Sequence, residues 1–217
     1  MLVDLKVVQL MSSRLCHDLV GPVGAVNNGL ELMNEGRDQN QNEDGVALDL
    51  VQRSAKQTAA RLAFFRAAFG AGKGSLNEAR RLIEGLLDGG KVALDWSRTE
   101  TADLNGEVSA GGLKLFLNMI LLGVDALPRG GTLGVDFTAL PEGLGMAVSA
   151  RGPGACIKDD LKTALSPAVS LQGLSPHNVH GFFAGCLANA LKSEIEIDEK
   201  SENQVGFAVL VTPGEEG

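Results

Sequence analysis

The chain has 217 residues, of which 44% are hydrophobic and 21% charged, and its formal net charge is −8 at pH 7. This size suits one large domain or two small ones with a real hydrophobic core. The acidic balance argues against nucleic acid as a partner. Because the sequence has no apolar run of about 18 residues, no membrane span is expected.

The N-terminus has no positively charged segment followed by an apolar core, so we expect no secretory signal. The three cysteines are widely spaced and match no metal-ligand pattern, which suits a reducing compartment. With only three histidines and no cluster of His, Cys and acidic residues, we expect no metal site. These features together predict a cytoplasmic protein.

The first helical pattern runs from about residue 2 to residue 36. Its apolar residues recur at steps of three or four, or simple multiples of these, and comprise Leu5, Val8, Leu15, Leu19, Val23, Val26, Leu30 and Met33. This pattern predicts one buried face of an amphipathic helix. His17 is two residues from both Leu15 and Leu19, so at about 100° per residue its imidazole should point away from that face, into water.

An exposed histidine on a helix is most often an ordinary solvated residue. The neighbours of His17 on its own face are, however, unusual, and comprise Leu10, Ser13, Arg14, Val20, Gly21 and Gly24. Three of them are small, although Gly in a helix costs about 1 kcal/mol relative to Ala. Small side chains leave room for a second protein, and the guanidinium of Arg14 could hold phosphoryl oxygens. Pro22 should kink the helix one turn past His17.

His17, Asp18 and Leu19, with Pro22 five residues after the histidine, resemble the phosphoacceptor box of sensor histidine kinases. The longer run of residues 17–25, followed by residues 29–32, is similar to the ChpT-type histidine phosphotransferases of alphaproteobacterial phosphorelays. The resemblance implies that His17 is the phosphoacceptor. Asp18 receives a supporting role, because side chains at i and i+1 do not face each other on a helix.

A second helix is expected from about residue 43 to residue 69, after a polar turn at residues 36–42. Its inner face should comprise Leu50, Ala55, Thr58, Leu62, Phe65 and Phe69. Two long helices joined by a short turn form an antiparallel hairpin. The hairpin alone leaves its apolar faces half covered, and pairing with a second copy as a four-helix bundle would cover them, which predicts a homodimer. The alternative is that the hairpin packs against its own C-terminal domain.

Residues 71–74 form a small glycine-containing joint, which divides the chain into a hairpin domain at residues 1–71 and a second domain at residues 75–217. The expected elements of the second domain are helices at about 75–87 (capped by Ser75), 112–127 and 175–192 (capped by Ser175), and strands at about 91–96, 132–139, 144–151, 194–199 and 205–212. This order predicts an α/β sandwich with a mixed sheet and helices on one face, and an α+β fold for the whole chain.

The second domain resembles a degenerate ATP-binding domain of a histidine kinase. Residues 117–132 are similar to the asparagine box, but Leu122 stands where that family has its magnesium-binding Asn, and Mg²⁺ requires oxygen ligands. Residues 150–154 are similar to the first glycine box, with Ala150 in place of the Asp that binds adenine. Residues 180–185, where a glycine-rich lid belongs, are mostly bulky and apolar. Each feature also has an ordinary structural interpretation: residues 152–154 alone could form any surface turn, and Asn118 could be a hydrogen-bonded core residue.

The resemblance implies a relay in which His17 accepts a phosphoryl group from one receiver-domain aspartate and passes it to another, without ATP binding or autokinase activity. The implied partners are the receiver domain of a hybrid histidine kinase and response regulators. The chain should hold no cofactor or metal of its own, and the receiver should bring the Mg²⁺. Two alternatives stay open: an active histidine kinase, which Leu122 and Ala150 argue against, and a non-catalytic dimeric scaffold in which His17 is incidental.

Overall fold

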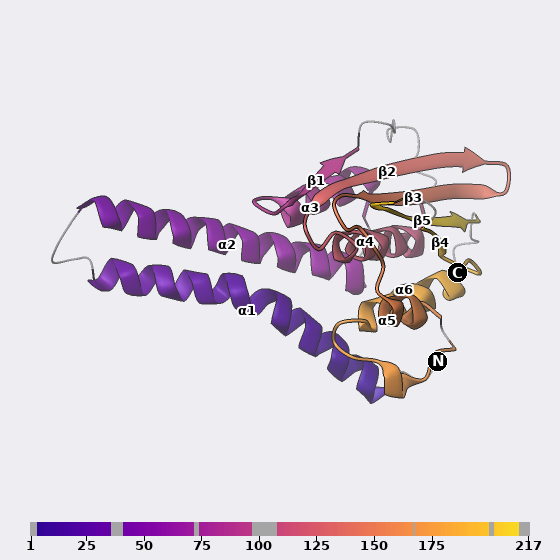
Figure 1. The fold of residues 1–217 in the computed structure, drawn as a ribbon, viewed down its shortest axis with the longest axis horizontal. Helices are drawn as coiled ribbons and strands as arrows, with labels where there is room; N and C mark the ends of the chain where they lie inside the picture. The colour runs from indigo at the N-terminus through magenta and orange to yellow at the C-terminus, as the bar shows by residue number, and fades with distance from the viewer. Residues whose placement is uncertain are drawn as a thin grey trace.

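The computed structural model describes residues 4–35, 41–71, 74–96, 108–166, 168–199 and 202–212, and has a long helical hairpin joined to an α/β layer (Figure 1). The helices are α1 (Leu5–Glu35), α2 (Gln41–Phe69), α3 (Leu76–Leu87), α4 (Ala110–Asp125), α5 (Asp159–Ala164) and α6 (Val179–Ala190). The strands are β1 (Val92–Asp95), β2 (Gly131–Leu140), β3 (Gly143–Arg151), β4 (Glu196–Asp198) and β5 (Gln204–Val211). The predicted α+β fold is confirmed. The expected turn at 36–42 and joint at 71–74 lie partly outside the described residues, and the domain boundary stays a prediction.

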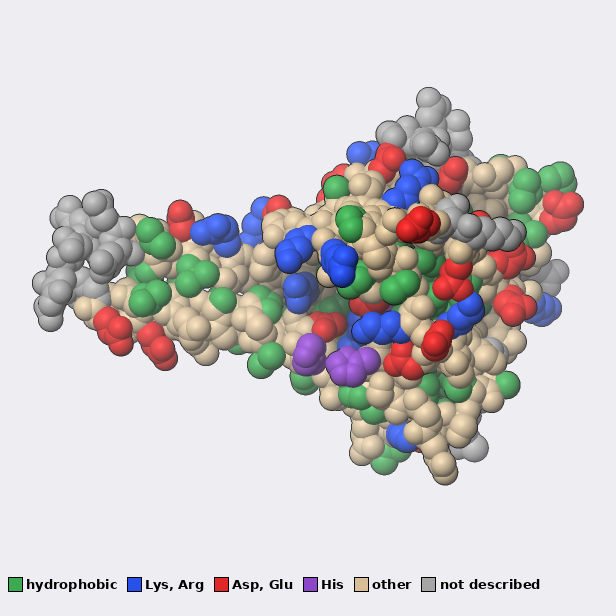
Figure 2. Space-filling view, in the orientation of Figure 1, with side chains coloured by type: hydrophobic (Ala, Val, Ile, Leu, Met, Phe, Trp, Pro, Cys, Tyr) green, Lys and Arg blue, Asp and Glu red, His purple; other side chains and the backbone are tan. Residues whose placement is uncertain are grey.

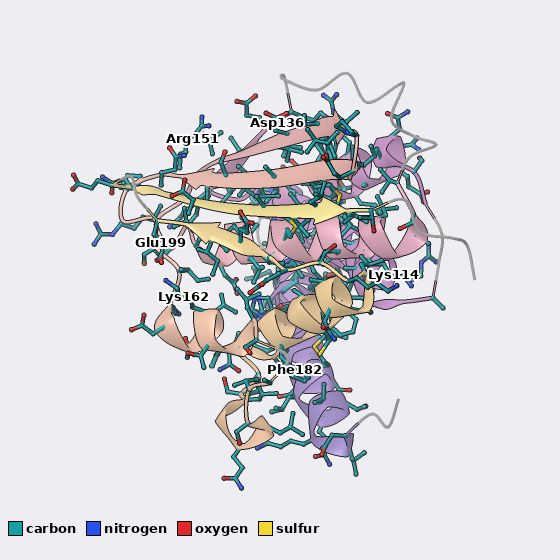
Figure 3. All side chains as sticks on the ribbon, turned by 90° about the vertical axis from the view of Figure 1, so that its right-hand side faces the viewer. Lys114, Asp136, Arg151, Lys162, Phe182 and Glu199 are labelled. Atoms are coloured by element: carbon teal, nitrogen blue, oxygen red, sulfur yellow. The ribbon has the colours of Figure 1, made fainter. Side chains whose placement is uncertain are left out.

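The sheet is mixed, as predicted, with strand order β1-β2-β3-β5-β4. β1 pairs with β2 in parallel, and the other pairs are antiparallel. Side chains along β3 alternate, so that Met146 and Val148 are buried against the helices. On the opposite face, Asp136 and Arg151 stand away from the helical layer (Figure 3). The helices therefore cover one face of the sheet.

The hairpin helices run antiparallel and pack closely where Gly29 of α1 faces α2 (Figure 1). A Cβ atom at Gly29 would lie 2.7 Å from Cγ2 of Val51 and 3.2 Å from the carbonyl oxygen of Ala47. The absent side chain is therefore what lets the two backbones approach. α1 continues through Pro22, and it changes direction along its length in Figure 1, as expected of a helix with an internal proline.

The apolar face of α1 is buried only in part. Leu15 and Leu19 pack against the main core, whereas Leu5 is 69% exposed and Val8, Val23 and Leu30 are also exposed. The hairpin therefore packs in part on its own C-terminal domain, which was the alternative prediction, and much of the rest of the apolar face is left exposed. The four-helix bundle of a homodimer stays a prediction.

The predicted inner face of α2 was wrong in part. Phe65 is buried as expected, but Leu62 is half exposed and Ala55 is exposed, while Phe64 and Ala68 are fully buried. The physical reason is that the last turns of α2 enter the core that also contains side chains of α3 and α4, whereas its earlier turns pack against Gly29 of α1 at Ala47 and Val51. The buried face therefore rotates along the helix, which one fixed period does not capture.

The start of α6 also differs from the prediction. Ser175 was expected as its N-cap, but the helix begins at Val179 and Asn178 occupies the cap position. The side-chain oxygen of Asn178 accepts a hydrogen bond from the backbone N–H of Ser175 at 2.8 Å, which closes a turn before the helix. The short helix α5 was not predicted. None of the helices in the described ranges is both long and apolar enough to cross a membrane.

Candidate functional site

His17 lies on α1 where the hairpin meets the rest of the molecule, and its side chain is 74% exposed. This exposure agrees with its position opposite Leu15 and Leu19. The imidazole borders a cavity of about 480 Å³ between α1 and the C-terminal part of the chain. The lining residues comprise Ser13, Arg14, His17, Asp18, Val124, Asp125, Pro128, Lys158, Asp160, Leu161, Pro176 and His177. Figure 2 shows exposed histidines together at this junction, among acidic and basic side chains.

Asp18 contacts the ring of His17 directly. Its Oδ1 atom lies 3.3 Å from Nδ1 of His17. An ionised carboxylate can only accept hydrogen bonds, so Nδ1 must carry the proton in this contact. In a neutral imidazole the other nitrogen, Nε2, then has the free lone pair and is the nucleophilic atom. The i, i+1 spacing that argued for only a minor role does permit this contact, and both side chains line the same cavity.

The backbone of Asp18 is held by the second helix of the hairpin. Pro22 has no N–H to donate to the carbonyl of Asp18, which would be its partner four residues earlier. Nη1 of Arg61, on α2, donates to that carbonyl oxygen instead. A buried carbonyl without a partner is costly, so Arg61 repairs the break that Pro22 makes and ties α2 to the residue next to His17.

Arg14 is largely buried at this junction, with a side chain that is 13% exposed. Nη2 donates to both carboxylate oxygens of Asp125, at 3.0 and 3.3 Å. Nη1 donates to the carbonyl of His177 at 3.0 Å and lies 2.9 Å from Nδ1 of His180. Nε lies 3.5 Å from Oδ2 of Asp18. The guanidinium therefore joins α1 to α4 and α6, and is not the free fork for phosphoryl oxygens that the sequence suggested.

His180 is fully buried and neutral in this arrangement. A guanidinium can only donate, so Nδ1 of His180 accepts from Arg14 and the proton sits on Nε2. Nε2 lies 3.0 Å from Oδ2 of Asp125, although the N–H bond is not aligned for a straight hydrogen bond. Burial lowers the pKa of His180, against the opposing influence of Asp125. The charge of the imidazolium is thus excluded from a site where Arg14 is already a cation.

Asp125 is the anion of this cluster. Burial by itself raises the pKa of its carboxyl group, but the contact with His180 and the charge of Arg14 outweigh that effect and leave the pKa below its usual value. Because the guanidinium is always charged, an ionised Asp125 beside a neutral His180 balances the charge of Arg14 without placing a second cation in the cluster.

Two further side chains of the C-terminal part face His17 across the cavity. The ring of His177 meets that of His17 edge-on, with centroids 6.2 Å apart. Lys158, just before α5, is exposed and lines the same cavity. An anionic group brought to Nε2 of His17 would therefore find two potential donors on the opposite wall.

The other residues expected on the His17 face lie as follows. Ser13, Val20 and Gly21 are exposed, and Leu10 and Gly24 are half buried. A Cβ atom added at Gly21 or at Gly24 would meet no atom of this chain within 4 Å. Packing within the chain therefore gives no reason for these glycines, in contrast to Gly29.

The residues that resemble nucleotide boxes lie in the core. Leu122 and Ala150 are both fully buried. Residues 180–185 belong to α6 instead of a loop, and a Cβ at Gly185 would lie 1.9 Å from the carbonyl oxygen of Leu165, so this glycine seats α6 against the end of α5. Asn118 is a core residue, whose Nδ2 donates to the carbonyls of Ala68 and Lys114. Within the described ranges no group of three or more His, Cys, Asp and Glu side chains could hold a metal ion.

Sequence reasoning missed Asp125, His177 and His180 as members of this site. A signal was present for two of them. Asp125 is the one acidic residue of the mostly apolar helix α4, and His180 follows Val179 in an apolar segment. A titratable group in such surroundings requires a partner, but nothing in the sequence names that partner as Arg14.

The junction between the helical hairpin and the α/β layer thus presents an exposed imidazole beside an open cavity, with Nδ1 in contact with a carboxylate. Comparison with known proteins identifies the family of this chain. Residues 76–203 match the model of the histidine phosphotransferase C-terminal domain. The chain is 33% identical to the protein phosphotransferase ChpT of Brucella abortus (strain 2308), over 90% of this chain and 91% of that protein. It belongs to the histidine phosphotransferase family.

A solved bacterial phosphotransferase has the same architecture. It matches with a TM-score of 0.80 and 29% identity, covering 96% of this chain and 98% of that one. A fainter likeness, with a TM-score of 0.49 and 18% identity, links 65% of this chain to 95% of a catalytic domain of the histidine kinase ThkA.

Proposed function

We propose that this chain is a phosphorelay intermediate that carries a phosphoryl group on Nε2 of His17. The observation that carries the proposal is the exposed ring of His17, whose Nδ1 is engaged by Asp18 and whose free nitrogen borders an open cavity. Membership of the histidine phosphotransferase family, and a Brucella relative named a protein phosphotransferase, support the same reaction.

The transfer needs no proton to leave the ring. The lone pair of Nε2 attacks the phosphorus of an aspartyl phosphate, the N–P bond forms, and the P–O bond to the aspartyl carboxylate breaks. The ring keeps its proton on Nδ1 and becomes cationic, and the carboxylate of Asp18, 3.3 Å away, offsets that charge. In the second transfer the electron pair returns to Nε2 as the phosphoryl group passes to a new carboxylate. Catalysis is then mainly positioning and charge stabilisation.

The partners in this proposal are receiver domains, first that of a hybrid histidine kinase and then those of response regulators. Each would dock on the exposed side of α1 around His17, where Leu10, Val20 and the open glycines offer apolar contact and close approach. Each receiver would bring its own Mg²⁺, because an aspartyl phosphate needs a cation that His17 and its neighbours do not supply.

We also propose that the chain works as a homodimer. Large apolar side chains remain exposed on both helices of the hairpin, and comprise Leu5, Val8, Val23, Leu30, Leu32, Val46, Leu48 and Leu62. On α1, the spacing of Leu5, Val8, Val23 and Leu30 places these four on one face of the helix, and an exposed apolar face is typical of an interface. A second hairpin packed on it would complete a four-helix bundle and place one His17 on each side of the two-fold axis.

The lack of ATP binding belongs to the same proposal. The two positions that would coordinate Mg²⁺ and the adenine amino group carry the buried, apolar Leu122 and Ala150, and the lid segment is a packed helix. Autophosphorylation from ATP is therefore not expected.

The test is phosphoryl transfer with labelled ATP and a cognate hybrid kinase receiver. The protein is incubated with ATP alone, and then with the phosphorylated receiver, as wild type and as His17→Ala. Label that appears only with the receiver, and only in wild type, supports the relay. Label from ATP alone would identify an active kinase. Absence of label from every cognate receiver, with intact binding, would identify a scaffold.

A further inference from the structure

We propose that Asp125 of α4 is a positioning residue for His17, acting through Arg14 and Asp18, so that the C-terminal domain sets the orientation and tautomer of the phosphoacceptor. The inference rests on the proposed role of His17. It gives the C-terminal domain a role without nucleotide, namely to orient the ring of His17. One connected set of side chains performs this role: Asp125, Arg14 and Asp18.

The set runs without a gap from α4 to the reactive ring. Asp125 receives both carboxylate contacts from Nη2 of Arg14, at 3.0 and 3.3 Å. Nε of the same guanidinium lies 3.5 Å from Oδ2 of Asp18. The second oxygen of Asp18, Oδ1, lies 3.3 Å from Nδ1 of His17. Asp125 thus holds Arg14 at Nη2, Arg14 holds Asp18 at Oδ2, and the other oxygen of Asp18 is free to contact His17.

Asp18 needs this support because it is exposed enough to turn away. Its side chain is 26% exposed, and in the described part of the chain its carboxylate forms ion-pair contacts with Arg14 and His17, so that without Arg14 the contact with His17 would have to hold it. Arg14 in turn is on a helix face that would leave a long side chain free to move. Nη2 of Arg14 contacts both oxygens of Asp125, while Nη1 donates to the carbonyl of His177 and contacts Nδ1 of His180. Both terminal nitrogens of the planar guanidinium are therefore held, which fixes the direction of Nε toward Asp18.

A purely structural role would make a different prediction. If Asp125 only holds the hairpin against the C-terminal domain, its loss should weaken docking of receivers and lower stability together. If it positions His17, its loss should change the ring itself: Nδ1 would no longer be held as the donor, and a larger fraction of the neutral ring would carry its proton on Nε2, the atom that must attack. That tautomer is unreactive at Nε2.

The experiment compares wild type, Asp125→Asn and Asp136→Asn in the full chain. Asp136 is on the open face of the sheet, so its variant is a matched exchange of carboxylate for amide away from His17. Two quantities are measured: the tautomer of His17 from the ¹⁵N chemical shifts of its ring, and the single-turnover rate of transfer from a phosphorylated receiver as a function of receiver concentration.

For Asp125→Asn we expect the ¹⁵N shifts to move toward the tautomer protonated at Nε2, and the transfer rate at saturating receiver to fall about tenfold to hundredfold, the usual effect of misplacing a reacting group. The half-saturating receiver concentration should stay within about twofold of wild type. Asp136→Asn should match wild type in both measurements.

A folded Asp125→Asn variant with wild-type ¹⁵N shifts and an unchanged saturating rate would overturn the proposal, and so would a change confined to the half-saturating concentration. If Asp125→Asn does not fold, Arg14→Lys replaces it, because a lysine keeps the charge but cannot bridge both carboxylates in fixed geometry; the same shift and loss of rate are expected. Failure of the proposed function is distinguishable, because wild type would then take up no label from any receiver, or transfer would survive in His17→Ala.

Discussion

A methyl group added at Gly24 should stabilise the protein and impair its function, and the two effects can be measured separately. Gly24 is inside α1, and a Cβ there would meet no atom of this chain within 4 Å. Gly in the middle of a helix is less stable than Ala by about 0.5–1 kcal/mol. Gly24→Ala should therefore raise the melting temperature by about 1–4 °C.

The same methyl group should weaken transfer if a receiver approaches α1 at this position. An extra methyl in a close-packed contact costs about 1–3 kcal/mol, which corresponds to roughly 5- to 150-fold in affinity. The half-saturating receiver concentration should rise accordingly, while the rate at saturation stays near that of wild type. Gly24 is a cleaner test than Gly21, because Gly21 precedes Pro22, and a proline disfavours the helical conformation for a preceding residue that has a Cβ.

Gly45→Ala in α2 is the matched control. A Cβ at Gly45 also meets nothing within 4 Å, and Gly45 is not among the residues around His17, so this variant should gain stability without losing transfer. The reasoning is refuted if Gly24→Ala raises the melting temperature and transfers like wild type. It is refuted equally if the variant weakens self-association, measured by sedimentation, and leaves receiver docking unchanged, since the small side chain would then serve contact between copies.

Three more outcomes follow from the site and its supports. Arg61→Ala should lower the free energy of unfolding, measured in urea, by about 1–3 kcal/mol in the wild-type background. The loss should be clearly smaller in a Pro22→Ala background, where the backbone N–H of residue 22 can donate to the carbonyl of Asp18. Equal losses in both backgrounds would contradict this reasoning. Burial holds the pKa of His180 below the usual histidine value of about 6.5. The unfolded chain therefore binds more protons near that pH, so the melting temperature should fall between about pH 7.5 and pH 5.5 and fall less in His180→Gln. Parallel curves for the two proteins would exclude His180 as the cause. Gly185→Ala places a Cβ 1.9 Å from a backbone carbonyl oxygen at the end of α5 and should destabilise the chain by at least about 1–3 kcal/mol, whereas Gly173→Ala, with open space, should not.

What depends on local pattern could be predicted from the sequence. His17 is exposed because Leu15 and Leu19, two residues to either side, pack inward, and a helical period is enough to derive that. The helix from Leu76 likewise begins where the Ser75 side chain accepts from the backbone N–H of Glu78 at 3.2 Å. Such features are contained within a few consecutive residues.

Contacts between residues that are far apart in the sequence could not be predicted. The periodicity placed Arg14 on the open face with His17, yet its partners Asp125 and His180 lie 111 and 166 residues further along the chain. No local pattern records that α4 and α6 reach α1. The same limit explains the start of α6, where the side chain of Asn178 forms a turn with Ser175 and delays a helix that the Ser-Pro pair alone would begin earlier.

In our proposal, the position of Asp125 gives the C-terminal α/β domain a task at the phosphoacceptor. Phosphoryl exchange between an aspartate and a histidine needs an exposed ring with the proton on the correct nitrogen, and a surface on which a receiver docks. The hairpin supplies the ring and, through Arg61, the backbone contact beside it, and Arg14 is the side chain of the same helix that holds the carboxylate of Asp18 against the ring. In our proposal the C-terminal domain fixes that neighbour through Asp125 and also forms the wall of the cavity that faces His17. A domain with buried, apolar side chains at its nucleotide-box positions would then still have a reason to remain, because the orientation of the phosphoacceptor depends on it.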